Sequence, residues 1–322
     1  MELSTIYELV QEDLVKVEDR LRSVSNVDFR HLSELLDYSL KSNGKRIRPM
    51  LTLLSGKFYD YNLDYLLTMA TAVEIMHTAT LVHDDAIDNS PVRRGRPTVN
   101  ELWGDEKAVL LGDYLFAEAG ALTASTQNLR AIKLFADTLK AISCGELNQA
   151  FNAFNLEQSR PQYFQRVSKK TASLFAMATE SGAALSQAPE ESIQILIEYG
   201  YNLGIAFQIV DDILDFIGTE EELGKPVGSD LTEGTLTMPA MLLLEHYPED
   251  NPVKRLFGNR DDEGNIKLAI ELVRNSPLII QECYQIASDY CAKACHNLKL
   301  LPDNASRQSL IELAEFIVIR NR

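Results

Sequence analysis

Apolar residues recur with a helical period over most of the chain. Positions three and four residues apart share one face of a helix, and such stripes begin at Leu14 and at Leu66. No segment has the strict alternation of a half-buried strand, so an all-α fold in a single domain spanning 1–322 is expected. The polar stretch 247–263 is expected to be a surface connection. The pattern predicts helices over about 105–155 (two helices), 162–187, 189–217, 264–299 and 304–320.

Composition narrows the class of protein. Hydrophobic residues make up 45% and charged residues 24% of the 322 positions, which is ordinary for a soluble globular protein. The net charge of −16 argues against nucleic acid and against docking on anionic lipid. Four cysteines show neither zinc-site spacing nor disulfide density. The start MELSTIYELVQED is unlike a secretory signal, and no apolar run of membrane-spanning length is expected, so the predicted location is cytoplasmic.

One acidic pattern, Asp-Asp-x-x-Asp, occurs twice in apolar surroundings, in LVHDDAID and in FQIVDDILDF. Asp84 and Asp88 share a helix face, as do Asp211 and Asp215. Carboxylates among apolar neighbours are costly unless a cation holds them, and oxygen-only ligands favour Mg²⁺ shared with phosphates. A solvated acidic face would explain one cluster better than two. A ferritin-like carboxylate site would need Glu-x-x-His pairs, which these clusters lack.

Two loops place basic residues just before a proline that marks a helix start. SNGKRIRP leads to Pro49, and NSPVRRGRP leads to Pro97. Cations are unfavourable at the positive end of a helix dipole, and a bound phosphate would relieve them. Pairing with the acidic surface is the alternative. The closeness of Arg93 and Arg94 to Asp88 favours a phosphate site beside a metal site.

Together these segments resemble the trans-type polyprenyl diphosphate synthases, in particular the long-chain members that make heptaprenyl, octaprenyl or solanesyl diphosphate. LVHDDAIDNSPVRRGRPT is similar to the first aspartate-rich motif, and FQIVDDILDF with ELGKPVGSDLTEGTLTMP is similar to the second. GKRIRP, VEIMHTATL and SKKTASLF agree as well. The resemblance implies a helical bundle around a deep central cavity, in a homodimer. The enzyme would be a transferase that condenses isopentenyl diphosphate repeatedly onto an allylic prenyl diphosphate, helped by about three Mg²⁺ ions.

The resemblance also implies roles for single residues. The two metal motifs would be Asp84, Asp85 and Asp88, and Asp211, Asp212 and Asp215. Direct metal ligands would be Asp84, Asp88, Asp211 and Asp215. Isopentenyl diphosphate would be held by Lys45, Arg48, His77 and Arg94. The allylic diphosphate or the early cation would be contacted by Arg93, Lys170, Thr171, Gln208 and Lys225. Glu146 and Gln149 are further candidates to line the site.

Product length in this family depends on the residues below the first aspartate motif. A large aromatic four or five residues before the first aspartate gives short products, and this chain has Thr80 and Ala79 there. About one turn further down, at about 3.6 residues per turn, Met76 only partly fills the next level, so a product of about seven or more isoprene units is expected, suited to a quinone side chain.

Three other functions stay open at this point. A geranylgeranyl diphosphate synthase would use Met76 as its floor. A catalytically silent partner subunit would bind prenyl diphosphates without turning them over, although both aspartate motifs are intact. A terpene cyclase also ionises diphosphates, but its second motif is of an Asn/Ser/Glu type, and the basic residues expected for isopentenyl diphosphate are present here.

Overall fold

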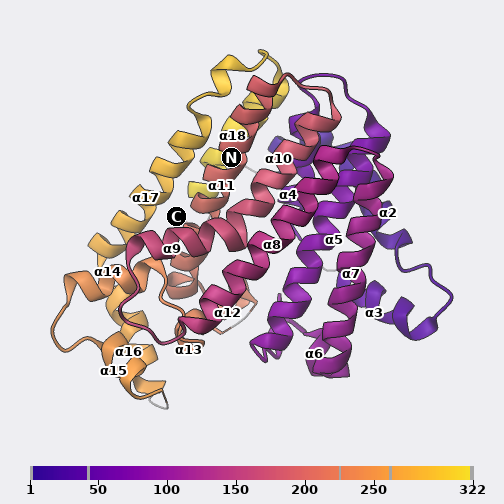
Figure 1. The fold of residues 1–322 in the computed structure, drawn as a ribbon. Helices are drawn as coiled ribbons and strands as arrows, with labels where there is room; N and C mark the ends of the chain where they lie inside the picture. Colours follow the sequence, from indigo (N-terminus) through magenta and orange to yellow (C-terminus); the bar gives the residue numbers. More distant parts are fainter. Residues whose placement is uncertain (1–2, 42–43, 225, 261–262, 320–322) are drawn as a thin grey trace.

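The computed structural model describes residues 3–41, 44–224, 226–260 and 263–319, and it confirms the all-α prediction (Figure 1). The helices are α1 (Leu3–Tyr7), α2 (Gln11–Ser23), α3 (Arg30–Leu40), α4 (Ile47–Gly56), α5 (Leu63–Ile87), α6 (Val99–Trp103), α7 (Asp105–Ser125), α8 (Leu129–Phe151), α9 (Arg160–Val167), α10 (Ser173–Leu185), α11 (Glu190–Ile217), α12 (Glu220–Leu223), α13 (Ser229–Thr232), α14 (Met238–His246), α15 (Pro252–Gly258), α16 (Glu263–Arg274), α17 (Pro277–Cys295) and α18 (Ala305–Ile319). Single turns form η1 (Glu8–Val10), the π-helical η2 (Ser168–Ala172) and η3 (Leu298–Leu300).

The interior of the bundle is formed by α4, α5, α10 and α11. α10 packs against the other three and against α8, while α7 runs beside α5 and α17 beside α11 (Figure 1). α4 and α10 are apolar on nearly every face, which is why both can be surrounded by other helices. The two helices that carry the aspartate clusters, α5 and α11, are therefore fixed relative to each other by the packed core.

α5 corrects one sequence expectation. By length and composition it could cross a membrane, but 72% of its most apolar window is buried inside the protein. A core helix passes the same test as a membrane span, and the burial identifies α5 as a core helix. Its N-terminus is capped by Asn62, whose side chain accepts from the Tyr65 backbone N–H.

Two glycines let α11 approach α10 and η2 closely. A Cβ on Gly200 would lie 2.7 Å from the Phe175 carbonyl oxygen, and one on Gly204 would lie 2.6 Å from the Ala172 Cα. Neither would fit without a backbone shift. Gly200, Gly204 and Gln208 are four residues apart and share one helix face, so the same close approach brings Gln208 against η2.

Three local predictions need correction. The polar stretch 247–263 contains the short helix α15. Val253 and Leu256 lie one turn apart on this helix and are buried, which is enough to anchor a helix of this length. The arginine loop forms a two-residue hairpin in which β1 (Val92–Arg93) pairs with β2 (Arg96–Pro97). The predicted helix 264–299 is broken into α16 and α17 at the proline that starts α17.

Candidate active site

A cavity of about 920 Å³ opens at the end of the bundle where α5 and α11 end. Its wall is formed by α5, α8, η2, α11, the arginine hairpin and the segment around α12 and α13, and Figure 1 shows α12 and α13 toward the lower end of the bundle. Acidic and basic side chains share this wall, so the cavity could hold a highly charged ligand. The predicted residues that line it are Lys45, Arg48, His77, Thr80, Asp84, Asp88, Arg93, Arg94, Glu146, Gln149, Lys170, Thr171, Gln208, Asp211 and Asp212.

In the first aspartate motif, the three carboxylates differ in surroundings. Asp84 and Asp88 line the cavity, whereas Asp85 lies outside its wall and accepts a 2.7 Å hydrogen bond from Arg93 Nε. Burial raises the pKa of Asp85 to about 6, against the opposing charge of Arg93. Asp85 therefore fixes the arginine hairpin to α5, while its neighbours face the cavity as the helical spacing predicted.

The second motif differs from the prediction at Asp215. Asp211 and Asp212 line the cavity, but the described structure places Asp215 outside the wall. The Asp215 carboxylate accepts from Ser229 Oγ at 3.0 Å and from the Asp230 backbone N–H at 3.3 Å, at the start of α13. Asp211 and Asp215 share a helix face, as predicted, but the loop that follows α11 folds back and packs against Asp215. In this geometry Asp215 anchors the loop rather than facing the cavity.

Asp212 is fully buried and carries the strongest local network. Its carboxylate accepts from Tyr163 Oη at 2.6 Å and from Gln208 Nε2 at 2.8 Å. Gln208 Oε1 in turn accepts from Thr171 Oγ1 at 2.6 Å. Burial raises the pKa of Asp212 to about 7, and the charge of Asp230 adds to this effect. Thr171 and Gln208 are thus joined as the resemblance implied.

Lys170 points from η2 into the acidic part of the cavity. Its Nζ lies 2.9 Å from Glu146 Oε2, 3.4 Å from Gln149 Oε1 and 3.9 Å from Asp84 Oδ2. Burial lowers the pKa of Lys170, but the carboxylates of Asp84 and Glu146 outweigh it, so the net pKa is raised and the ammonium stays charged. π-helical turns are frequent at functional sites. The choice of Lys170 over Lys169 fits this geometry, because Lys169 is not part of the cavity wall.

The opposite wall is cationic. Arg48 stacks on Phe175, with its Cζ 4.7 Å from the ring centroid, and burial lowers the pKa of its guanidinium to about 10. Among the described residues its Nε has no hydrogen-bond partner. Burial lowers the pKa of His77 well below its usual value, and the charges of Arg48 and Arg94 add to this, so the imidazole is neutral. Burial also lowers the pKa of Arg94. Such crowded cations suit a diphosphate.

Arg46 has a structural role that the sequence did not separate from its neighbours. Its backbone is left-handed, with φ of 47°, directly before α4. Its guanidinium pairs with Glu18 of α2 and, at 2.6 Å, with Glu74 of α5. Glu74 is buried, so Arg46 is neutralised inside the protein. Glu18 and Glu74 therefore hold Arg46 in place at the cavity wall, which Lys45 and Arg48 line beside it.

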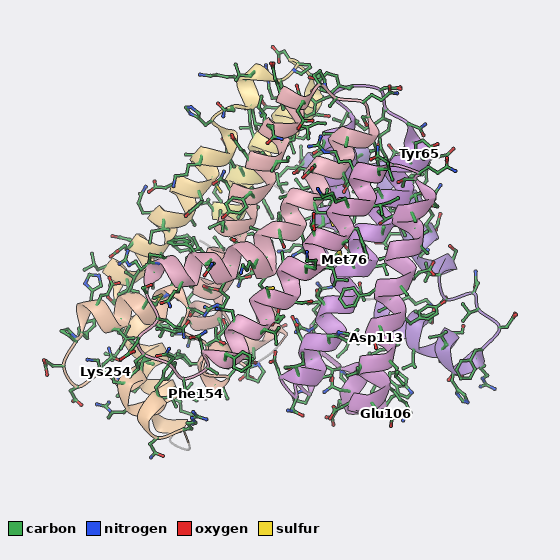
Figure 2. The ribbon with its side chains drawn as sticks, in the orientation of Figure 1. Tyr65, Met76, Glu106, Asp113, Phe154 and Lys254 are labelled. Atoms are coloured by element: carbon green, nitrogen blue, oxygen red, sulfur yellow. The ribbon has the colours of Figure 1, made fainter. Side chains whose placement is uncertain are left out.

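The three residues assigned to product length have different surroundings in the structure. Thr80 lines the cavity, one turn before Asp84, but Met76 and Ala79 are fully buried in the core and lie outside its wall. Figure 2 shows Met76 inside the bundle. Each residue turns a helix by about 100°, so Ala79 faces away from Thr80 and His77. The assignment of Ala79, Thr80 and Met76 to product length stays a prediction, and of the three only Thr80 lies in this cavity wall. Apolar wall positions at this depth are Leu81, Ile142, Leu174 and Phe207.

The loop after the second motif closes on the arginine hairpin. Gly224 has φ of 66°, and a Cβ there would lie 2.4 Å from the Arg94 Cα, so only glycine permits this approach. The Gly224 carbonyl accepts from the Gly95 N–H at 3.3 Å. Lys225, a predicted allylic diphosphate contact, lies outside the described residues. Thr235 is buried and lines the cavity.

The donor set of the cavity fits Mg²⁺. Asp84, Asp88 and Asp211 offer only carboxylate oxygens. Burial raises the pKa of Asp88, Lys170 opposes this, and the charge of Asp84 adds to it. Within the described part of the chain no three acidic, histidine or cysteine side chains form a complete metal site. Mg²⁺ commonly takes one or two carboxylates and completes its shell with water and substrate phosphates, so an incomplete protein set is compatible with it.

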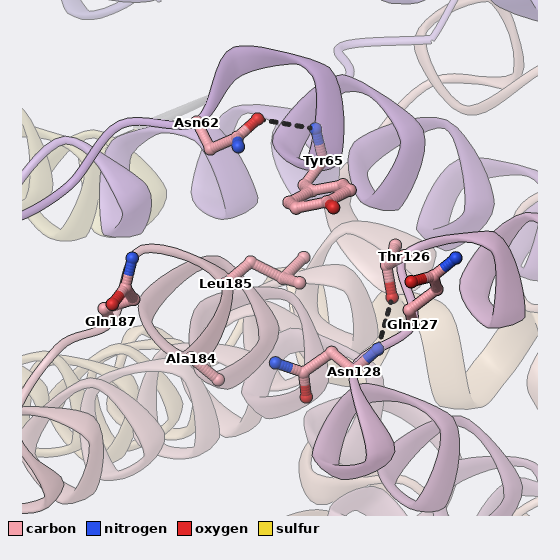
Figure 3. Close-up of a pocket in the computed structure, with 8 residues that line it drawn as sticks. All are labelled: Asn62, Tyr65, Thr126, Gln127, Asn128, Ala184, Leu185 and Gln187. Atoms are coloured by element: carbon pink, nitrogen blue, oxygen red, sulfur yellow. Dashed lines mark hydrogen bonds between the residues drawn. The ribbon is translucent and has the colours of Figure 1, made fainter.

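A second pocket of about 320 Å³ lies at the other end of α5 (Figure 3). Asn62 and Asn128 cap the starts of α5 and α8 there, and Tyr65 and Leu185 form its apolar side. No acidic or basic residue is among the described residues that line it. It therefore has none of the charged groups that suit the first cavity for diphosphate.

The raised pKa of Asp212 predicts a pH-dependent stability. Its folded pKa of about 7 exceeds its ordinary value of 3.8, so the folded protein binds this proton more tightly. The stabilisation is complete below about pH 4 and is lost as the pH rises through about 7. In the absence of divalent metal, the unfolding free energy of the wild type minus that of Asp212→Asn should therefore fall from about pH 5 to pH 8, by up to about 1.4 kcal/mol per pH unit. Urea titrations at each pH measure it, and a difference that stays flat or rises with pH contradicts it.

A deep cavity with two aspartate clusters and a cationic wall, inside a helical bundle, defines a class of enzyme that handles diphosphate esters. Residues 29–273 match the polyprenyl synthetase family. Component 2 of heptaprenyl diphosphate synthase from Geobacillus stearothermophilus is 37% identical over 320 residues, covering 98% of each chain. The structure of polyprenyl synthase from Caulobacter crescentus CB15, complexed with calcium and isoprenyl diphosphate, is 35% identical with a TM-score of 0.92, covering 100% of this chain and 98% of that one. Geranylgeranyl pyrophosphate synthase from Lactobacillus brevis ATCC 367 is 31% identical with a TM-score of 0.89, covering 98% of each chain. The chain belongs to the polyprenyl synthetase family and is a prenyltransferase of that family.

Proposed function

We propose that this protein condenses isopentenyl diphosphate repeatedly onto an allylic prenyl diphosphate and releases a long all-trans polyprenyl diphosphate. The observation that carries the proposal is the single cavity in which Asp84, Asp88 and Asp211 face a cationic wall that contains Arg48 and Arg94. One charged ester can bind at the acidic side through metal, and a second can bind at the cationic side directly.

In the proposed reaction, the allylic C–O bond breaks and the leaving diphosphate keeps the electron pair. The allylic carbon then forms a bond to the double bond of isopentenyl diphosphate, and the adduct loses a proton to the released diphosphate. Lys170 and Arg93 would neutralise charge on the leaving group, while Thr171 and Gln208 orient it. Bound Mg²⁺, held by Asp84, Asp88 and Asp211, would supply further neutralisation of the diphosphate oxygens.

The second ester would be held on the cationic wall. Arg48 and Arg94 supply fixed positive charge for the diphosphate of isopentenyl diphosphate, and Lys45 adds a third cation at the rim. His77 is neutral, so it can donate one hydrogen bond without adding charge. Burial lowers the pKa of Arg94 and His77, and the neighbouring cations add to this effect; their mutual repulsion is relieved once a dianionic group lies between them.

A long product is the finer part of the proposal. Thr80 is the cavity position where a large aromatic would shorten the product, and it is small here. The heptaprenyl name of the Geobacillus relative agrees with a long product. The alternative is a geranylgeranyl diphosphate synthase, favoured by the high TM-score of the Lactobacillus enzyme. The size of residue 80 is the observation that favours the longer chain.

We also propose a homodimer in the cytosol. α7 and α8 expose large apolar side chains, including Leu110 at 60%, Leu147 at 57% and Phe151 at 86%. A second copy could cover them, and light scattering of the pure protein tests this. The name of the Geobacillus relative, component 2, describes one part of a two-component enzyme, so a different partner chain or a silent subunit is the competing assignment. The four cysteines are all free, which suits a reducing compartment.

The test is an assay of the purified chain with labelled isopentenyl diphosphate, Mg²⁺, and geranyl, farnesyl or geranylgeranyl diphosphate as primer. We expect incorporation that depends on Mg²⁺ and is abolished by a chelator, with a main product of about seven or more isoprene units. Products that stop at geranylgeranyl diphosphate would support the alternative enzyme. No incorporation by the pure chain, with activity restored by a second protein, would support a silent or incomplete subunit.

A further inference from the structure

Tyr163 is a buried tyrosine whose hydroxyl is committed to the second aspartate motif. It lies on α9, a helix that carries neither aspartate motif, and its side chain is 0% exposed. The phenol donates a 2.6 Å hydrogen bond to Asp212 Oδ2, and the Met238 backbone N–H donates to the same oxygen at 3.5 Å. Burial raises the pKa of Tyr163 well above its usual value, so the phenol keeps its proton. Tyr163 therefore supplies the strongest hydrogen bond to that side of the carboxylate.

The other oxygen of the Asp212 carboxylate orients a second side chain, that of Gln208. Asp212 Oδ1 accepts from Gln208 Nε2 at 2.8 Å, which turns Gln208 Oε1 toward Thr171 Oγ1 at 2.6 Å. A reversed amide would place its oxygen against the carboxylate, which repels it. The orientation of Gln208 thus depends on the position of Asp212, and the position of Asp212 depends on Tyr163.

α9 is itself fixed in place, so the Tyr163 hydroxyl that it carries is held in a fixed position. Arg166, one turn after Tyr163, lies over the Tyr163 ring with its Cζ 5.5 Å from the centroid. Its guanidinium donates to the Leu236 carbonyl at 2.8 Å and to Gln158 Oε1 at 2.9 Å. The helix is therefore tied to the segment that follows the second motif.

We propose that Tyr163 is a positioning residue for the allylic diphosphate: through Asp212 it holds Gln208 and Thr171 in the orientation that receives this substrate. The inference rests on the proposed function, because it assigns Gln208 and Thr171 to the allylic substrate. Tyr163 itself touches neither reacting group in this scheme. Its removal should therefore affect one substrate more than the other, which a general loss of stability would not do.

The experiment compares Tyr163→Phe with Tyr199→Phe. Tyr199 is a matched control, since it is also 0% exposed and its hydroxyl donates a 2.7 Å hydrogen bond, in this case to the Leu310 carbonyl of α18. It lies on α11, several turns before Asp212. For Tyr163→Phe we expect the KM for the allylic primer to rise about tenfold, with the KM for isopentenyl diphosphate within about twofold of the wild type. Tyr199→Phe should leave both KM values unchanged while lowering the melting temperature.

A second measurement keeps the test decisive if Tyr163→Phe is poorly folded. In a Gln208→Leu background, where the amide that Tyr163 positions is gone, Tyr163→Phe should add little further change to the primer KM. KM does not depend on the folded fraction, so it can be read in a partly unfolded preparation. Equal rises in both KM values, kinetics identical to Tyr199→Phe, or additive effects with Gln208→Leu would each overturn the proposal. Failure of the proposed function is distinguishable, because the wild type itself would then form no product.

Discussion

Asp84→Asn should lower the rate of prenyl transfer by roughly two to three orders of magnitude at saturating Mg²⁺, and Asp211→Asn should do the same. Each change removes one negative charge from the cavity wall that is proposed to hold the metal. The affinity for Mg²⁺ should fall as well. Neither variant should unfold, because Asp84 and Asp211 lie on a polar cavity wall and a neutral amide lessens the repulsion between neighbouring carboxylates. Steady-state rates over a range of Mg²⁺ concentrations, with melting temperatures, measure both effects.

Asp137→Asn is the matched control for this pair. Asp137 lies on α8 with a side chain 54% exposed and a surface partner in Lys140. The same chemical change there should leave the rate within about twofold, since surface ion pairs contribute little. If Asp84→Asn retained wild-type turnover, the assignment of the first motif to metal would be wrong, and the silent-subunit reading would gain support.

Thr80→Phe should shorten the product from the proposed long chain to roughly farnesyl or geranylgeranyl length. Thr80 lines the cavity one turn before Asp84, so an aromatic ring there would fill space that the growing chain needs. The first condensation should be nearly unaffected, because the diphosphate contacts of the primer stay in place. Chromatography of the products with excess isopentenyl diphosphate measures the length.

Ala79→Phe separates this effect from simple crowding. Ala79 is fully buried in the core and lies outside the cavity wall. A phenylalanine there should destabilise the fold by about 1–3 kcal/mol through overpacking, with less change in product length than Thr80→Phe. A short product from Ala79→Phe together with an unchanged product from Thr80→Phe would show that the growing chain follows another path through the bundle.

Much of the fold was predictable because it depends on local periodicity. The apolar stripes predicted α11 and α18 close to their observed bounds, and the final β-branched residues of α18 are helical as expected. The acidic pairs at i and i+4 predicted that Asp84 and Asp88 would face the same way. The missed helix α15 is short, so its periodic signal spans only two turns and resembles a polar loop.

Side-chain partners from distant segments could not be predicted in this way. Arg46 and Arg48 both line the cavity, yet only tertiary contacts pair Arg46 with Glu18 and Glu74. Asp215 matched the metal pattern, but the start of α13 folds back onto its carboxylate. Neither outcome is encoded in the local spacing, because each depends on which element arrives from elsewhere in the chain.

The sequence alone determined that the protein is helical and that two acidic helical turns have cations close by. The reason is that helix geometry and charge repulsion act between residues a few positions apart. Only the tertiary structure decided that Tyr163 would hold Asp212 and that the start of α13 would fold onto Asp215. The physical reason is that hydrogen bonds and close packing join atoms that are near in space, and the approach of α9, α10 and α11 is fixed by the whole core at once.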